Sequence, residues 1–275
     1  MDDYEKLELY KTYPCNELIK LKDDPIAMYC LGERCRNNDK KLKWYTVSAE
    51  QGFDLAQLDL GIIYEENDEY EKAVYWFTKA AEQGDDSAQF YLGNCYYIGR
   101  GIEKDLKKAV YWYEKSAEQG NDFAQLELGL MYKKGEGVKK DYYKAFSLFK
   151  EAMDNGERGG QDSAKLEIAK FYESGIVVKQ DFKKALKLYK EVAEMGYVEA
   201  TYKMGFCYRH GHGVKKNYKK AAYWFRKDAK RYYKSAYALS DLYWFGMGVK
   251  QDYKKSKYWR KIGKEDKEGR EQDEV

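Results

Sequence analysis

Small residues and aromatic residues recur along the chain at fixed distances from one another. In the clearest copy, Ala124 lies five residues before Gly129, and Tyr132 lies three residues after it. Spacings of three to five place side chains on one face of a helix, so this frame predicts an amphipathic helix with a small residue at its centre. This central residue, called the anchor below, recurs seven times, as Gly32, Gly61, Gly93, Gly129, Ala169, Gly205 and Ser240. The chain is therefore predicted to contain seven copies of a unit of about 36 residues.

A second helical pattern follows each anchor and is clearest in KKAVYWYEKSAEQG, at residues 107–120. One position of this pattern holds a large apolar residue: Trp44, Trp76, Trp112, Leu148, Leu188, Trp224 and Trp259. Glycines that we expect to end the helix in a left-handed conformation follow it: Gly52, Gly84, Gly120, Gly156 and Gly196. Each unit is therefore predicted to be two antiparallel helices. Stacked units would bury a continuous core, which makes the predicted fold an all-α solenoid.

The segment KGEGVKKDYYKA, at residues 134–145, has a glycine pair followed by lysines and so resembles a phosphate-binding loop. Such a loop follows a strand and occurs once. Here the pair occurs four times, each time between two predicted helices: Gly99–Gly101, Gly135–Gly137, Gly211–Gly213 and Gly246–Gly248. We therefore predict a turn with positive φ, not a nucleotide site. Residues expected to cap the following helix come next: Asp105, Asp141, Asp181, Asn217 and Asp252.

Composition supports a helical protein with a buried core, since 44% of the 275 residues are apolar and only two are prolines. No window approaches the roughly 18 apolar residues needed to span a bilayer. The first residues, MDDYEKLELYKTYP, lack the apolar run of a secretion signal. Five cysteines at irregular spacing argue against a disulfide framework. We therefore expect a cytoplasmic protein with reduced thiols.

The repeated unit resembles the Sel-one-like (SLR) repeat family, a relative of the tetratricopeptide repeats, from about residue 25 to 262. The family pattern is followed closely at residues 85–120 and 121–156. The resemblance implies a right-handed superhelical α-solenoid of about seven antiparallel helix pairs. It also implies a scaffold or adaptor that binds other proteins without catalysis. Around the solenoid at residues 25–264, we expect a helical lead-in at residues 1–24 and an acidic, disordered tail at residues 265–275.

Some copies depart from the family pattern. The first two lack the glycine connector, and the fifth keeps only its first glycine, Gly175. The fourth carries an insertion near residues 157–161.

Residues able to carry chemistry are few. Cys207, His210 and His212 could be metal ligands, but Cys207 lies two residues after its anchor, where the other copies have apolar core residues. We therefore predict a core cysteine, two exposed histidines and no metal. Motifs of serine hydrolases, zinc proteases and redox pairs are missing from the sequence. We predict no catalytic residue and no cofactor.

The net charge of +3 conceals a strong asymmetry. Lysine and arginine minus aspartate and glutamate gives −8 for residues 1–100, +1 for 101–196, +14 for 197–264 and −4 for 265–275. The basic end either keeps the chain soluble, or binds an acidic protein, anionic lipid or nucleic acid. A third alternative is head-to-tail self-association of acidic and basic ends. The acidic tail is also a candidate to fold back over the basic repeats.

Resemblance to the tetratricopeptide fold implies that a partner binds the concave face, which is lined by the first helix of each repeat. The residues implied for partner binding are Phe90, Asn94, Tyr97, Lys133, Tyr202, Phe206, Arg209 and His210. Aromatic side chains beside arginine and lysine are typical of energetically dominant contacts in protein interfaces. On the same face, Leu126 and Leu130 have the alternative role of packing against the next repeat.

Overall fold

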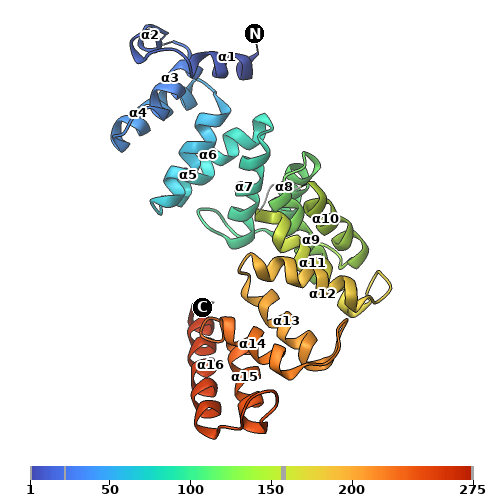
Figure 1. The fold of residues 1–275 in the computed structure, drawn as a ribbon. Helices are drawn as coiled ribbons and strands as arrows, with labels where there is room; N and C mark the ends of the chain where they lie inside the picture. Colours follow the sequence, from blue (N-terminus) through green and yellow to red (C-terminus); the bar gives the residue numbers. More distant parts are fainter. Residues whose placement is uncertain (1, 22, 156–158, 274–275) are drawn as a thin grey trace. The chain divides into compact units, whose positions relative to one another are not determined.

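The computed structural model describes residues 2–21, 23–155 and 159–273, and this part of the chain is helical without any strand. It divides into two compact units, Met1–Asp141 and Tyr142–Val275, called unit 1 and unit 2. Figure 1 labels their helices. Unit 1 contains α1 (Asp3–Tyr10), α2 (Cys15–Leu18), the 3-10 helix η1 (Ile19–Leu21), α3 (Pro25–Glu33), α4 (Asn38–Glu50), α5 (Asp54–Glu66), α6 (Tyr70–Gln83), α7 (Asp86–Ile98), α8 (Leu106–Glu118) and α9 (Asp122–Lys134). Unit 2 contains α10 (Tyr142–Asn155), α11 (Gly159–Ser174), α12 (Phe182–Glu194), α13 (Val198–His210), α14 (Tyr218–Asp228), α15 (Tyr233–Phe245) and α16 (Tyr253–Asp273). No helix in the described part of the chain has the length and apolar character needed to cross a membrane.

Within each unit, first helices pack against the second helices that follow them, as α7 does with α8 and α13 with α14, and the anchor is where the two backbones approach. A Cβ added to Gly93 would lie 2.6 Å from the ring of Tyr113, and one added to Gly205 would lie 2.4 Å from the ring of Phe225. Both rings are fully buried. The anchor is therefore small because an aromatic side chain of the second helix occupies its space. The predicted all-α fold of paired, stacked helices is confirmed.

Buried glutamines link successive repeats in unit 1. The side-chain amide of Gln89 donates to the carbonyl of Ala81, and its carbonyl accepts a hydrogen bond from Gln119, at 2.9 Å. Gln57 makes the same two contacts one repeat earlier, with Ala49 and Gln83. Because a buried amide that loses its partner is costly, these bonds fix the register between repeats.

The glycine connectors are turns, as predicted. Gly135 and Gly137 have φ of 83° and 69°, and a Cβ on Gly137 would lie 2.5 Å from the carbonyl oxygen of Leu106. The second glycine thus allows the turn to press against the start of the preceding repeat's second helix. In the fifth copy, Val177 adopts the same left-handed conformation, with φ of 69°. A β-branched residue is strained there.

The predicted helix ends are largely confirmed. Four of the five glycines after the second helices have φ between 93° and 105°: Gly52, Gly84, Gly120 and Gly196. The fifth, Gly156, lies outside the described residues, as does part of the insertion near residues 157–161. Side-chain caps of the second helices are present at Asp105, Asp181, Asn217 and Asp252.

The C-terminus differs from the disordered tail expected at residues 265–275. Helix α16 continues through Asp273, and residues 274–275 lie outside the described part of the chain. Asp266 accepts a hydrogen bond from the backbone of Tyr233 at 2.8 Å, and Arg270 donates to the carbonyl of Arg231 at 2.6 Å. These contacts tie α16 to the start of α15.

Candidate binding faces on the first helices

In unit 1, aromatic side chains connect α7 and α9. The rings of Phe90 and Phe123 lie 5.8 Å apart, and Phe90 also contacts Tyr113. Asn94 accepts a hydrogen bond from the Tyr113 hydroxyl at 2.6 Å. Phe90 and Asn94 are half-buried, whereas Phe123 is 45% exposed. These side chains therefore present an apolar surface with an amide at its edge.

Tyr97 and Lys133 lie further along the same two helices. The Tyr97 hydroxyl donates to Glu136 at 2.9 Å, and the Lys104 ammonium lies 5.7 Å from the centre of its ring. Lys133 is half-buried on α9. Four of the eight predicted binding residues thus belong to unit 1: Phe90, Asn94, Tyr97 and Lys133.

Glu127 adds a carboxylate that the sequence prediction missed. It lies on α9, two residues before the anchor Gly129, and is half-buried. It forms no hydrogen bond or ion pair with another residue that the structure describes. Burial raises the pKa of its carboxyl group, and the nearby Lys134 offsets this only in part. The α7–α9 face, defined as Phe90, Asn94, Tyr97, Phe123, Glu127 and Lys133, therefore contains a desolvated acceptor beside an aromatic surface.

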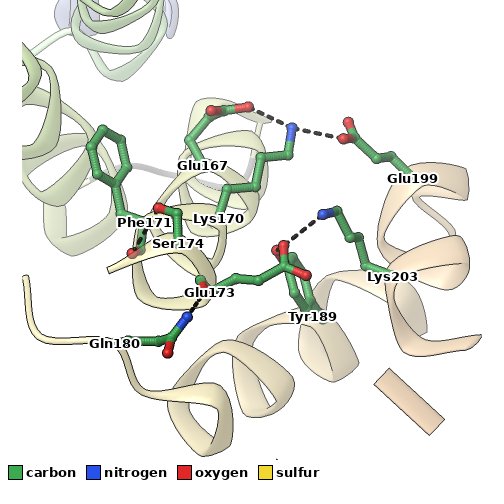
Figure 2. A network of polar contacts seen from close by, with 9 residues as sticks. All are labelled: Glu167, Lys170, Phe171, Glu173, Ser174, Gln180, Tyr189, Glu199 and Lys203. Carbon is green, nitrogen blue, oxygen red and sulfur yellow. Dashed lines mark hydrogen bonds and ion pairs between the residues drawn. The ribbon is translucent and has the colours of Figure 1, made fainter. Parts of the chain in front are cut away.

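In unit 2, the charged residues at corresponding positions are paired with one another (Figure 2). Lys170 on α11 lies 2.8 Å from both Glu167 and Glu199. Glu173 accepts from Lys203 at 2.5 Å and from the Tyr189 hydroxyl at 2.8 Å. These contacts join α11, α12 and α13 into a cross-linked surface.

The other four predicted residues lie together on α13. The ring of Phe206 lies 4.2 Å from His210 and 6.3 Å from Tyr202. Arg209 is engaged with Asp241 of α15, at 3.4 Å. His210 is exposed, and partial burial together with the positive charge of Arg209 lowers its pKa. We define the α11–α13–α15 face by Glu167, Lys170, Glu173, Glu199, Lys203, Phe206, Arg209 and Asp241.

Cys207 is a core residue, as predicted. It is 1% exposed, and burial raises the pKa of its thiol to about 12. Groups of three or more His, Cys, Asp or Glu side chains able to hold a metal are missing among the described residues. The prediction of two exposed histidines is wrong for His212, which is half-buried and stacks on Phe182 at 4.4 Å. The connector turn places it against the start of α12.

One signal in the sequence could have revealed the missed carboxylates. The position two residues before the anchor is acidic in three copies, as Asp59, Glu127 and Glu167. Asp59 accepts a hydrogen bond from Tyr29 at 2.9 Å, and burial raises its pKa. An acidic residue that recurs two positions before a buried anchor predicts a carboxylate that is partly shielded from water.

Comparison with solved structures supports this fold. The protective antigen c5321 of uropathogenic Escherichia coli, which displays an SLR fold, superposes with a TM-score of 0.78 at 25% identity. The match covers 92% of this chain but only 56% of that one, so the chain spans little more than half of that relative. A Sel1 repeat protein from Oxalobacter formigenes matches with a TM-score of 0.67 and 30% identity, over 76% of this chain and 85% of that chain.

More distant likeness extends to a chain of the APC/C hetero-tetramer Cut9–Hcn1, with a TM-score of 0.52 and 14% identity. That match covers 93% of this chain and 47% of that one, and it concerns the fold alone. Among curated proteins, none matches the sequence significantly.

The sequence model of the Sel1 repeat matches six consecutive segments: residues 54–85, 86–121, 122–157, 163–197, 198–233 and 234–259. The first predicted copy, formed by α3 and α4, lies outside these segments but packs as a helix pair. With most of its length matched, and with similar solved structures of the same kind, the chain belongs to the Sel1 repeat family.

Proposed function

We propose that this protein is a non-enzymatic, cytoplasmic scaffold that binds a protein partner on the α7–α9 face. Sel1 repeat proteins are generally protein-interaction scaffolds. The α7–α9 face combines the half-buried ring of Phe90, the exposed ring of Phe123 and the carboxylate of Glu127. An extended segment of the partner would place an apolar side chain on the two rings and a hydrogen-bond donor on Glu127.

The single observation that carries this proposal is that Glu127 is half-buried and forms no hydrogen bond with another described residue. A carboxylate that is half-buried without a hydrogen bond is costly to the folded protein. A partner that donates N–H groups to it, above all from lysine or arginine, would offset that cost, since hydrogen bonds to charged groups are the stronger ones. An aromatic surface next to it also favours a cation.

Affinity purification with the intact chain tests the proposal. Three baits are compared: the natural chain, Glu127→Lys, and Glu118→Lys as the matched control. Glu118 is an exposed carboxylate on the second helix α8, so its variant makes the same change of charge away from the face. We expect at least one protein to be retained by the natural chain and by Glu118→Lys but lost with Glu127→Lys. Equal retention by all three baits would contradict the α7–α9 face.

A second candidate function rests on the basic surface of unit 2. Exposed lysines and arginines concentrate on the second helices α14 and α16: Lys219, Lys220, Arg226, Lys227, Lys254, Lys255, Lys257, Arg260, Lys261 and Lys264. Such a surface favours nucleic acid or an anionic membrane. Binding of duplex DNA, of RNA or of anionic vesicles that falls steeply with salt would support this alternative. Weak binding, similar for all three, would leave the lysines a solubilising role.

A further inference from the structure

The second helices differ at the large apolar position, which is tryptophan in five copies and leucine in two. In the α6 and α14 copies, this tryptophan packs against the core of the preceding repeat. Trp76 packs against the buried cluster around α3, α4 and α5, and Trp224 packs against the cluster around α11, α12 and α13. In α12 the position is held by Leu188. A smaller side chain therefore stands where the repeat normally places an indole ring.

A cavity of about 430 Å³ opens at this place, between α10 and α12 and over α11. Its apolar wall consists of Phe146, Met153, Ile168, Tyr172 and Leu188. All of these residues belong to unit 2. The volume lies within the usual range of ligand pockets, about 300 to 1,000 Å³.

The corresponding groove between α4 and α6 shows what tryptophan changes. There a hollow of about 410 Å³ is lined by Trp76 itself, with Ala49 and Gln57. Leu60 and its counterpart Ile168 are both buried, but only Ile168 lines its groove. The side chain of Trp76 therefore forms part of the wall of the α4–α6 hollow. In the α10–α12 groove, where Leu188 is smaller, Ile168 and Tyr172 of α11 also form part of the wall.

The rim of the α10–α12 pocket is basic. Its lining has two carboxylates, Asp154 and Glu191, and four lysines: Lys150, Lys165, Lys184 and Lys187. Lys165 lies 3.5 Å from Asp162, and Lys184 lies over the ring of Tyr172. Lys150 and Lys187 are exposed and form no ion pair with another described residue. The rim therefore favours a ligand with negative charge, as does the net charge of +11 of unit 2, which has 30 Lys and Arg against 19 Asp and Glu.

We propose that the α10–α12 pocket binds a tryptophan side chain from an acidic segment of a partner protein. The indole would take the place that the second-helix tryptophan fills in other copies, and flanking carboxylates would contact Lys150 and Lys187. Burial of a large aromatic ring supplies the affinity, and the lysines select acidic flanks. This site is independent of the α7–α9 face, so either proposal can fail without the other.

The test uses the intact chain and a seven-residue peptide with 5-fluorotryptophan at its centre and three acidic residues on each side. We expect saturable broadening and shift of its ¹⁹F NMR signal, since the chain contains no fluorine. Leu188→Trp should weaken binding roughly tenfold or more because its indole would cover Ile168 and Tyr172, whose counterparts do not line the groove beside Trp76. Met195→Trp, at a 68% exposed position outside the pocket, is the matched control and should bind as the natural chain does.

Two further peptides decide between pocket and surface charge. A peptide with basic flanks should bind weakly, and an acidic peptide with fluoroalanine in place of fluorotryptophan should not saturate. Binding of the tryptophan peptide that is unchanged in Leu188→Trp would overturn the proposal. So would equal binding of the alanine peptide, which would indicate adsorption to lysines alone. Circular dichroism of Leu188→Trp checks that the variant is folded.

Discussion

The α7–α9 face of unit 1 and the α11–α13–α15 face of unit 2 use the same repeat positions in opposite ways. In unit 2, Lys170 lies between two carboxylates, and Lys203 neutralises Glu173. In unit 1, Glu127 is half-buried without such a partner among the described residues, beside the rings of Phe90 and Phe123. The comparison teaches that one scaffold position can either join neighbouring repeats or remain available to another molecule.

The pKa shifts of buried charged groups also differ between the two units. Burial lowers the pKa of Lys170, but the carboxylates of Glu167 and Glu199 more than offset this, so the pKa of Lys170 is raised. In unit 1, burial raises the pKa of three carboxyl groups: Asp59, Asp85 and Glu127. Unit 1 therefore holds carboxylates that are costly to ionise, and unit 2 holds a network that stabilises charge.

Breaking the paired face should have the largest effect. Lys203→Met leaves Glu173, whose side chain is 15% exposed, with the Tyr189 hydroxyl as its remaining partner. We expect the free energy of unfolding to fall by about 2 kcal/mol, because a largely buried carboxylate loses its counter-charge. Urea denaturation followed by circular dichroism measures this. Lys190→Met, which removes an exposed pair with Glu194, should cost less than about 0.5 kcal/mol. Equal costs would show that the network does not stabilise unit 2.

A smaller effect is expected in unit 1 from Asp85, which caps α7 by accepting from the backbone of Ala88. Burial raises its pKa from 3.8 to about 6. Between about pH 4 and 6, Asp85 therefore keeps its proton in the folded state but has lost it in the unfolded state. The free energy of unfolding decreases as pH rises through this range. Asp85→Asn keeps the cap, as Asn121 does for α9, and removes this penalty.

Allowing for solvent screening, we expect Asp85→Asn to gain about 1 kcal/mol at pH 7 and little at pH 4. Urea denaturation at both pH values measures the difference. A gain of the same size at both would rule out the buried charge as its cause.

The carboxylate of Glu127, on the α7–α9 face, should give a still smaller gain when its charge is removed. Glu127→Gln removes a charge whose burial raises its pKa, so it should stabilise the chain by about 0.5 kcal/mol at pH 7. The raised pKa means that this gain shrinks as pH falls and the natural carboxyl binds a proton. Glu118→Gln, on the exposed surface of α8, should change nothing. A loss of stability in Glu127→Gln would mean that Glu127 has a stabilising role in the free protein.

The smallest effect is expected from Val177→Gly in the connector of the fifth copy. Gly137 in unit 1 and Val177 in unit 2 have the same φ of 69°. Val177→Gly should gain a few tenths of a kcal/mol, because relief of strain is partly offset by the greater freedom of glycine in the unfolded chain. Gly137→Val should instead destabilise, since its Cβ would meet the carbonyl of Leu106. Thermal unfolding of both variants checks the pair.

Local patterning predicted most of the fold. The anchors, connectors and helix caps are short-range features, so each could be identified from residues within one unit. Residues at the ends of the repeat array were harder: the tail beyond residue 264 has the composition of a disordered segment, yet Asp266 and Arg270 bind the start of α15. Their partners lie more than 30 residues away, and no local pattern reveals them.

The faces were predicted less well than the fold. Positions of aromatic residues follow from the anchor frame, and Phe90 and Phe206 indeed lie on first-helix surfaces. Whether a charge is paired depends on side-chain geometry between repeats, as in Lys203 with Glu173 and Arg209 with Asp241. For this reason the sequence alone reveals neither that Arg209 is engaged with Asp241 nor that Glu127 lacks a partner among the residues that the structure describes.

Site-specific photocrosslinking in cells tests whether a partner protein binds the α7–α9 face. The photoreactive p-benzoylphenylalanine is placed at Phe123 on the α7–α9 face or at Phe206 on the α11–α13–α15 face, two phenylalanines on first helices. We expect a discrete crosslinked protein from position 123 that disappears in the Glu127→Lys background, and no such product from position 206. A product from position 206 alone, or one from position 123 that persists with Glu127→Lys, would contradict this expectation.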